Sequence, residues 1–316
     1  MLKSKKVALI GAGMVGTSFL YSAMHRGIAN EYGIIDINIE GAAGNKLDLE
    51  DAVPTNNLPW KTEVIKYNNL KETDVLVIAA GRPQKPGETR LNMVADNAKI
   101  MQSIAAEVKK SAFSGITIIA SNPVDVLTHI YQKVTEFPPE RVISSGTSLD
   151  SARLKIGLSE MIDVAPQSIS AYVLGEHGDS SVAAFSSASV AGKPLSYFTK
   201  EYGITAEQLK ELHRSVCKKA YEIINRKSAT YYGIGSALAN LVQAVFKDTR
   251  EVYACGAQLN GEYNHSGFYA GTAAIIGSTG IRKVIEIDMS KDEQAQFDKS
   301  AETLKKTIRI AEKVIA

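Results

Sequence analysis

The first 36 residues restrict the fold of this chain more than any other stretch. The apolar run at residues 5–12, KKVALIGA, is typical of a buried strand, and the glycines of GAGMVG follow at its end, ahead of a helical pattern. Gly11, Gly13 and Gly16 at this spacing permit a tight turn and a close approach to a dinucleotide pyrophosphate at a helix N-terminus. A second strand-like run then ends at Asp36, 20 residues after Gly16. A carboxylate there would bind the ribose hydroxyls of NAD and repel the 2′-phosphate of NADP.

The remainder of the first half alternates short apolar runs with helical patterns. Three such runs are DVLVIAAG at 74–81, GITIIASNP at 115–123 and RVISSG at 141–146. Alternating strands and helices predict a parallel sheet with helices on both faces. The second half has long amphipathic helices and three strands on short connections, which favour antiparallel pairing. We therefore expect a Rossmann-type doubly wound domain over residues 1–145 and a mixed α+β catalytic domain over 146–316.

Composition excludes several functional classes. The chain has 316 residues, a net charge of +2 and no block of basic residues, which argues against a nucleic-acid partner. No apolar run reaches the roughly 18 residues of a membrane span, so we expect a cytoplasmic protein without a membrane partner. Cys217 and Cys255 have no metal-ligand spacing, and we expect free thiols and no metal site.

Two segments contain candidate catalytic residues. His177 lies in the polar segment GEHGDS, where a histidine can exchange a proton near neutral pH if a carboxylate orients it. In GTSLDSARLK, Thr147 or Ser148 could cap a helix that carries Asp150 and Arg153 on one face. Asp150 could orient the histidine and Arg153 could bind a carboxylate substrate. A plain ion pair within the helix explains the same spacing and stays open at this point.

Asn122 follows a predicted strand, at the edge of the sheet where ligands bind in open α/β folds. Its amide could bond to a nicotinamide ribose or to a substrate hydroxyl. Asn-Pro is also common in plain turns, which is the alternative interpretation.

The motifs together resemble those of one family. GAGMVG, QKPGETRL, SNPVD, GTSLDSAR, GEHGDS and ATYYGIG occur in the order and approximate spacing of L-lactate dehydrogenases of bacterial type, across essentially the whole chain. The malate dehydrogenases of the same superfamily share several of them. The resemblance implies hydride transfer between NADH and pyruvate to give L-lactate, and a homotetramer.

The resemblance also assigns roles to individual residues. It implies that His177 exchanges the proton, that Asp150 orients it, and that Arg90 polarises the substrate carbonyl when its loop closes. The implied substrate-binding residues are Gln84, Arg90, Asn122, Asp125, Arg153 and Thr230. The implied cofactor-binding residues are Gly11, Gly13, Val15, Gly16, Asp36, Tyr67, Gly81, Ser103, Asn122 and Ser145.

Two positions bear on specificity and regulation. Malate dehydrogenases typically have an arginine where this chain has Gln84, so a second substrate carboxylate would lack a charged partner here. At the positions that resemble a fructose 1,6-bisphosphate site the chain has Lys155 and Ser170, and serine cannot replace a cationic histidine. We expect weak activation by the bisphosphate or none.

Two other functions are compatible with part of this pattern. A dehydrogenase of the same fold could act on oxaloacetate or on bulkier 2-oxo acids, although Gln84 argues against oxaloacetate. A non-catalytic NAD-binding regulatory protein would be expected to lack His177, Asp150 or Arg90, and the sequence has all three.

Overall fold

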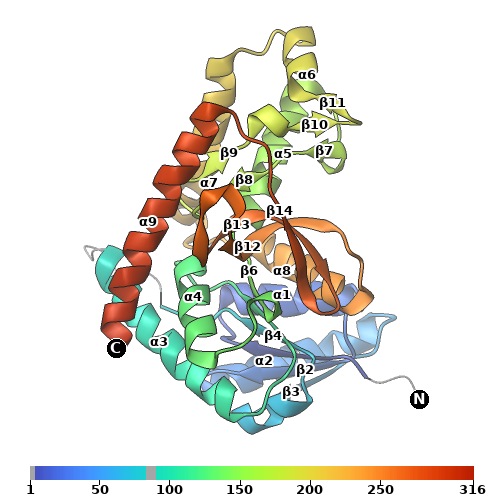
Figure 1. The fold of residues 1–316 in the computed structure, drawn as a ribbon. Helices are drawn as coiled ribbons and strands as arrows, with labels where there is room; N and C mark the ends of the chain where they lie inside the picture. The colour runs from blue at the N-terminus through green and yellow to red at the C-terminus, as the bar shows by residue number, and fades with distance from the viewer. Residues whose placement is uncertain (1–3, 83–89) are drawn as a thin grey trace.

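A nine-stranded sheet runs through the molecule in the computed structural model, which describes residues 4–82 and 90–316 (Figure 1). Its strand order is β14-β13-β12-β6-β5-β4-β1-β2-β3. The parallel strands are β1 (Lys6–Ile10), β2 (Glu31–Ile35), β3 (Lys61–Val64), β4 (Val75–Ile78), β5 (Ile116–Ile119) and β6 (Val142–Ser144). The antiparallel strands are β12 (Val252–Asn260), β13 (Ser266–Gly277) and β14 (Gly280–Ile285).

Helices cover both faces of the parallel part. One face carries α1 (Met14–His25), α2 (Ile39–Asp51) and α8 (Tyr232–Lys247), and the other carries α3 (Arg90–Lys110), α4 (Val124–Thr135) and α9 (Lys291–Ile315). Successive residues of β1 alternate between the two cores: Val7 and Leu9 pack with α1 and α8, whereas Ala8 and Ile10 pack with α3 and α4. Because side chains of a strand alternate in direction, burial on both faces requires the unbroken apolar runs of the sequence.

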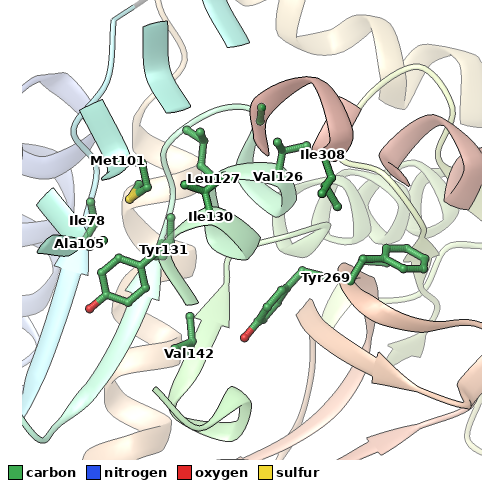
Figure 2. Packing of buried hydrophobic residues seen from close by; sticks show 14 of the residues in the cluster. Ile78, Met101, Ala105, Val126, Leu127, Ile130, Tyr131, Val142, Tyr269 and Ile308 are labelled. Carbon is green, nitrogen blue, oxygen red and sulfur yellow. The ribbon is translucent and has the colours of Figure 1, made fainter. Parts of the chain in front are cut away.

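The core that contains α3, α4 and α9 joins the two halves of the chain. Figure 2 shows Met101 of α3, Tyr131 of α4 and Tyr269 of β13 in one cluster, with Ile308 from α9 beside them. The final helix, α9, crosses the molecule to pack on α3 and α4. The C-terminal helix is therefore part of the core that also supports the parallel strands.

A smaller body lies beyond the sheet, at the top of Figure 1. It comprises α5 (Ser148–Ile162), α6 (Leu195–Glu201) and α7 (Ala206–Lys227) with the short strands β7 (Ile169–Ser170), β8 (Val173–Leu174), β9 (Val182–Ala183), β10 (Ser189–Val190) and β11 (Lys193–Pro194). These elements share a third apolar cluster, which includes Leu158, Ile169 and Val216.

The predicted α/β fold class is confirmed, with one addition. The antiparallel strands of the second half do not form a sheet of their own, because β12 pairs with β6 through Gly256 and Ser144 and so extends the parallel sheet. The division of the chain at residues 145 and 146 stays a prediction. Among the helices in the described part of the chain, none has an apolar stretch of the length that a bilayer requires.

The junction between β12 and β6 should be sensitive to volume. A Cβ on Gly256 would overlap Oδ1 of Asp125 and the side chain of Ser144, whereas a Cβ on Gly44 of α2 would meet no atom of residues 4–82 and 90–316 within 4 Å. We expect Gly256→Ala to lower the free energy of unfolding by about 1–3 kcal/mol through overpacking. The matched control Gly44→Ala should be neutral or stabilising by up to about 1 kcal/mol, because alanine favours helix.

Urea unfolding of both variants at one protein concentration measures this difference. Equal midpoints for the two variants would show that the sheet junction can relax around an added methyl group.

Candidate active site

The carboxyl ends of the parallel strands lead into a pocket of about 220 Å³. Four residues that the sequence predicts for the site line it: Asn122 after β5, Asp150 and Arg153 on α5, and His177 in the loop after β8. The remaining lining residues are Met93, Pro123, Gly178, Asp179, Cys217, Ala220, Tyr221 and Ile224. Segments from both halves of the chain therefore meet at one pocket.

A short hydrogen bond joins the histidine to the aspartate. Nδ1 of His177 lies 2.6 Å from Oδ2 of Asp150, whose side chain is only 6% exposed. An ionised carboxylate can only accept, so Nδ1 donates and Nε2 is left for exchange of a proton in the pocket. Burial disfavours the charged imidazole, but the charge of Asp150 and its hydrogen bond outweigh burial and raise the pKa of His177.

The same carboxylate also approaches the arginine. Oδ1 of Asp150 lies 3.5 Å from Nη1 of Arg153, and both side chains are almost fully buried. The ion pair within the helix and the orientation of His177 by Asp150 are therefore compatible, since Asp150 uses one oxygen for Arg153 and the other for His177. Burial lowers the pKa of Arg153, which nevertheless keeps a guanidinium charged at neutral pH. Its remaining donors suit the two oxygens of a substrate carboxylate.

The predicted cap of α5 is wrong. Thr147 occupies the N-cap position, but its hydroxyl makes no cap hydrogen bond and has no partner within the described residues. Ser148 instead donates to the carbonyls of Ser145 at 2.6 Å and Ala254 at 2.5 Å. Ser148 thus ties the start of α5, which carries Asp150, to strand β12 of the sheet.

A second pocket, of about 510 Å³, lies where β1, β2 and β4 end. Six predicted cofactor residues line it: Gly11, Gly13, Asp36, Tyr67, Gly81 and Ser103. Its other lining residues are Ile10, Ile35, Ile37, Ala79, Ala80, Arg82, Ile100 and Ile104. Apolar walls with one carboxylate at the rim suit an adenosine whose ribose hydroxyls point at that carboxylate.

The glycine turn of this pocket fits a dinucleotide. Gly11 has a φ of +99° and lies so close to the backbone of Ala80 that a Cβ would clash. Among the residues that the structure describes, a Cβ on Gly13 would meet no atom within 4 Å and no side chain caps α1, so the first N–H groups of α1 remain for a pyrophosphate. Asp36 accepts hydrogen bonds from the N–H groups of Ala12 at 2.6 Å and Asn38 at 2.8 Å, which fixes its carboxylate at the rim.

The structure places the other predicted residues away from these pockets. Gly16 packs closely against the backbone of Gly11. Val15 packs against the apolar cluster that contains α1 and α8, and Ser145 is buried. Thr230 lies between α7 and α8 and lines neither pocket. Gln84 lies outside the described residues, as does the side chain of Arg90 at the start of α3. Their assigned roles stay predictions.

One wall of the catalytic pocket was not foreseen. Cys217, Ala220, Tyr221 and Ile224 follow each other at helical spacing on α7 and line the pocket together. That spacing resembles an ordinary core stripe, but Tyr221 is 58% exposed and Ile224 43%. Cys217 is a free thiol whose pKa is raised by burial, so it contributes a neutral, apolar surface. Within the described residues no cluster of His, Cys, Asp or Glu is arranged to hold a metal ion.

Comparisons with known proteins agree with this geometry. Residues 5–144 match the model of the lactate/malate dehydrogenase NAD binding domain, and residues 147–315 match that of the lactate/malate dehydrogenase alpha/beta C-terminal domain. The chain belongs to the lactate/malate dehydrogenase family. Its N-terminal half is thus an NAD-binding domain, in keeping with the pocket beside Gly11 and Asp36.

Individual members of the family are similar over nearly their full length. A protein named L-lactate dehydrogenase from Mycoplasma mobile is 53% identical over 98% of this chain and 97% of the relative, and one from Mesoplasma florum is 48% identical over 99% of each. Among solved structures, the ligands-bound form of minor L-lactate dehydrogenase from Enterococcus mundtii has a TM-score of 0.95 at 38% identity and covers 97% of this chain and 98% of that one.

The carboxylate of Asp36 should determine cofactor preference. Asp36→Asn removes the negative charge and keeps one of the two oxygens, which can accept from Ala12 or from Asn38 but not from both. We expect the affinity for NADPH relative to NADH to rise by about tenfold, because charge repulsion of the 2′-phosphate is lost.

Fluorescence titration of wild type and variant with both nucleotides measures this ratio. An unchanged ratio would mean that the carboxylate does not face the adenosine ribose.

Proposed function

We propose that this chain is an NAD-dependent L-lactate dehydrogenase that interconverts pyruvate and L-lactate. The observation that carries the proposal is the hydrogen bond of 2.6 Å between His177 and Asp150, with the guanidinium of Arg153 in the same pocket. A histidine with a raised pKa and a buried arginine are the groups that the reduction of a 2-oxo acid requires. The names of the relatives from Mycoplasma mobile and Mesoplasma florum support the same activity.

The residues have distinct roles in this reaction. Arg153 binds the carboxylate of pyruvate through two parallel N–H groups and so orients the carbonyl. NADH, when bound, supplies the hydride that the carbonyl carbon accepts. Protonated His177 stabilises the charge that develops on the carbonyl oxygen and donates its Nε2 proton to it. Before the proton is transferred, Asp150 stabilises the imidazolium of His177 and holds its ring in place. One hydride and one proton convert pyruvate to L-lactate and leave His177 neutral.

The resemblance of the sequence adds Arg90 and Gln84 to the proposed reaction. Arg90 would add a second positive charge at the carbonyl oxygen. Gln84 would face the methyl group of pyruvate, where the second carboxylate of oxaloacetate would lack a charged partner. Thr230 would contribute to the far wall. Oxaloacetate and bulkier 2-oxo acids remain the alternative substrates, and binding of NAD without turnover is the alternative of another class.

The location of the protein, its oligomeric state and its activation are part of the same proposal. We expect a cytoplasmic homotetramer with little activation by fructose 1,6-bisphosphate. Two features support weak activation. Lys155 is half-buried, with its Nζ 5.8 Å from the ring of Tyr172. Ser170 is exposed on β7 and brings no charge.

Substrate preference is the first test. Purified protein should oxidise NADH far faster with pyruvate than with oxaloacetate, and Gln84→Arg should raise kcat/KM for oxaloacetate relative to pyruvate by about a hundredfold or more, because a buried carboxylate gains a partner. Steady-state assays with both substrates measure this. Higher efficiency of the wild type with oxaloacetate would move the assignment to malate dehydrogenase, and no turnover of any 2-oxo acid would favour a non-catalytic protein.

The pH dependence is a separate test of His177. Reduction of pyruvate needs the protonated imidazole, so its kcat/KM should fall as the pH rises through the raised pKa of His177, while oxidation of lactate rises. Asp150→Asn removes the charge that favours imidazolium, so both midpoints should move to lower pH. We also expect a loss of activity on the order of a hundredfold. Unmoved midpoints in pH profiles of the variant would show that Asp150 does not control the protonation of His177.

A further inference from the structure

Ser300 is a buried hydroxyl on the long C-terminal helix α9, with an exposed fraction of 0%. A hydroxyl in such a place costs stability unless it is hydrogen-bonded. Thr303 and Thr307 of the same helix bond to carbonyls of that helix, whereas Ser300 bonds to the segment that carries His177. The other buried residues of α9 are apolar: Phe297, Ala301, Leu304, Ile308 and Ala311.

The partners of Ser300 lie in residues 175–181, the catalytic loop, which joins β8 to β9. Its Oγ accepts from the N–H of Glu176 at 2.8 Å and lies 3.2 Å from Oγ of Ser180. Ser180 in turn donates to Oε2 of Glu176 at 2.5 Å. Gly175, with a φ of +83°, permits this approach, because a Cβ there would lie 2.5 Å from Oγ of Ser300. The C-terminal helix therefore contacts the loop on both sides of its histidine.

The hydrogen bonds of this cluster have one consistent direction. Each hydroxyl has a single hydrogen. Ser180 gives its hydrogen to the carboxylate of Glu176, so Ser300 is the donor in its contact with Ser180. Ser300 in turn accepts from the N–H of Glu176. Glu176, Ser300 and Ser180 thus form a closed ring, the hydroxyl ring, in which each bond polarises the next and each member depends on the others.

Other contacts hold the two ends of the catalytic loop. Gly175 exchanges two backbone hydrogen bonds with Gly271 of β13, at 2.9 and 2.8 Å. At the other end, Oγ of Ser181 lies 3.2 Å from Nε2 of His213 on α7. The hydroxyl ring therefore acts on the part of the loop between these ends, which is the part that carries His177.

We propose that Ser300 is a positioning residue, whose hydroxyl closes the ring and so holds His177 at hydrogen-bonding distance from Asp150. It acts without contact to substrate or cofactor, since it is not among the described residues that line either pocket. The inference rests on the proposed function, in which His177 donates the proton. A serine that only filled space could be replaced by alanine without consequence for the reaction.

The variants Ser300→Ala and Ser180→Ala and their combination test the ring in the full chain. We expect kcat with pyruvate to fall by about tenfold in each single variant, because His177 loses its fixed place. The KM for NADH should stay at the wild-type value, since the described lining of the second pocket contains no member of the ring. The double variant should be no slower than the slower single variant, because one missing hydroxyl already opens the ring.

Ile308→Val is the matched control. Ile308 lies on the buried side of α9 about two turns further on, in the core with α3 and α4, so the variant weakens the packing of the helix without removing a hydroxyl (Figure 2). It should keep the wild-type kcat. Ser180 is half-buried, so Ser180→Ala serves alone if Ser300→Ala does not fold, and Ser180→Thr, which keeps the hydroxyl, should restore kcat.

Three results would each overturn the proposal. They are a wild-type kcat in Ser300→Ala or in Ser180→Ala, an equal loss in Ile308→Val, and losses that multiply in the double variant. The last result would show that the two hydroxyls act independently and not through one ring.

Hydrogen exchange separates this inference from the proposed function. Ser300 protects the amide of Glu176, so mass spectrometry of a peptide that contains this amide reads the ring without substrate. Exchange should be faster in Ser300→Ala and Ser180→Ala and unchanged in Ile308→Val. No turnover by the wild-type protein, with faster exchange in the two serine variants, would reject the dehydrogenase and retain the ring. Normal turnover, with exchange and kcat unchanged in those variants, would reject the ring and retain the dehydrogenase.

Discussion

The hydrogen bond between Nδ1 of His177 and Oδ2 of Asp150 requires two segments to be placed to within a few tenths of an ångström. The segment with Asp150 is held by Ser148, which bonds to β12. The segment with His177 is held by Ser300 of α9, which accepts from the N–H of Glu176 at 2.8 Å. The extended sheet and the long C-terminal helix therefore each hold one of the two segments, and they supply rigid supports for a bond that tolerates little displacement.

Charge balance in the pocket follows from the same arrangement. One buried aspartate serves both a histidine and an arginine, so neither positive group is left unpaired in an environment of low dielectric constant. In the proposed reaction, Arg153 exchanges part of this pairing for the substrate carboxylate, while Asp150 keeps the ring of His177 in place. Asp150, Arg153 and His177 all lie within residues 147–315, which match the family's C-terminal domain model.

Much of this could be predicted from the sequence, for identifiable reasons. Strand, glycine turn, helix and Asp36 depend on residues close together in the chain, and the structure shows them around one pocket. Predictions that depended on distant segments were incomplete. Ser148 is the first residue of α5 rather than its cap, and its hydroxyl donates to the carbonyl of Ala254 in β12, 106 residues away in the chain. The wall on α7 was not predicted, since helical spacing does not indicate which element packs against it.

The sequence by itself determined the alternation of strands and helices, the glycine turn with its carboxylate, and the residue types of the catalytic set, because periodicity and short motifs are local properties of a chain. Only the tertiary structure decided that β12 continues the parallel sheet beside β6 and that Asp150 divides its two oxygens between His177 and Arg153. It also decided that Asp125 is buried and does not line the pocket. Each of these outcomes depends on which distant segments exclude water together, and burial is a property of the packed molecule rather than of any one segment.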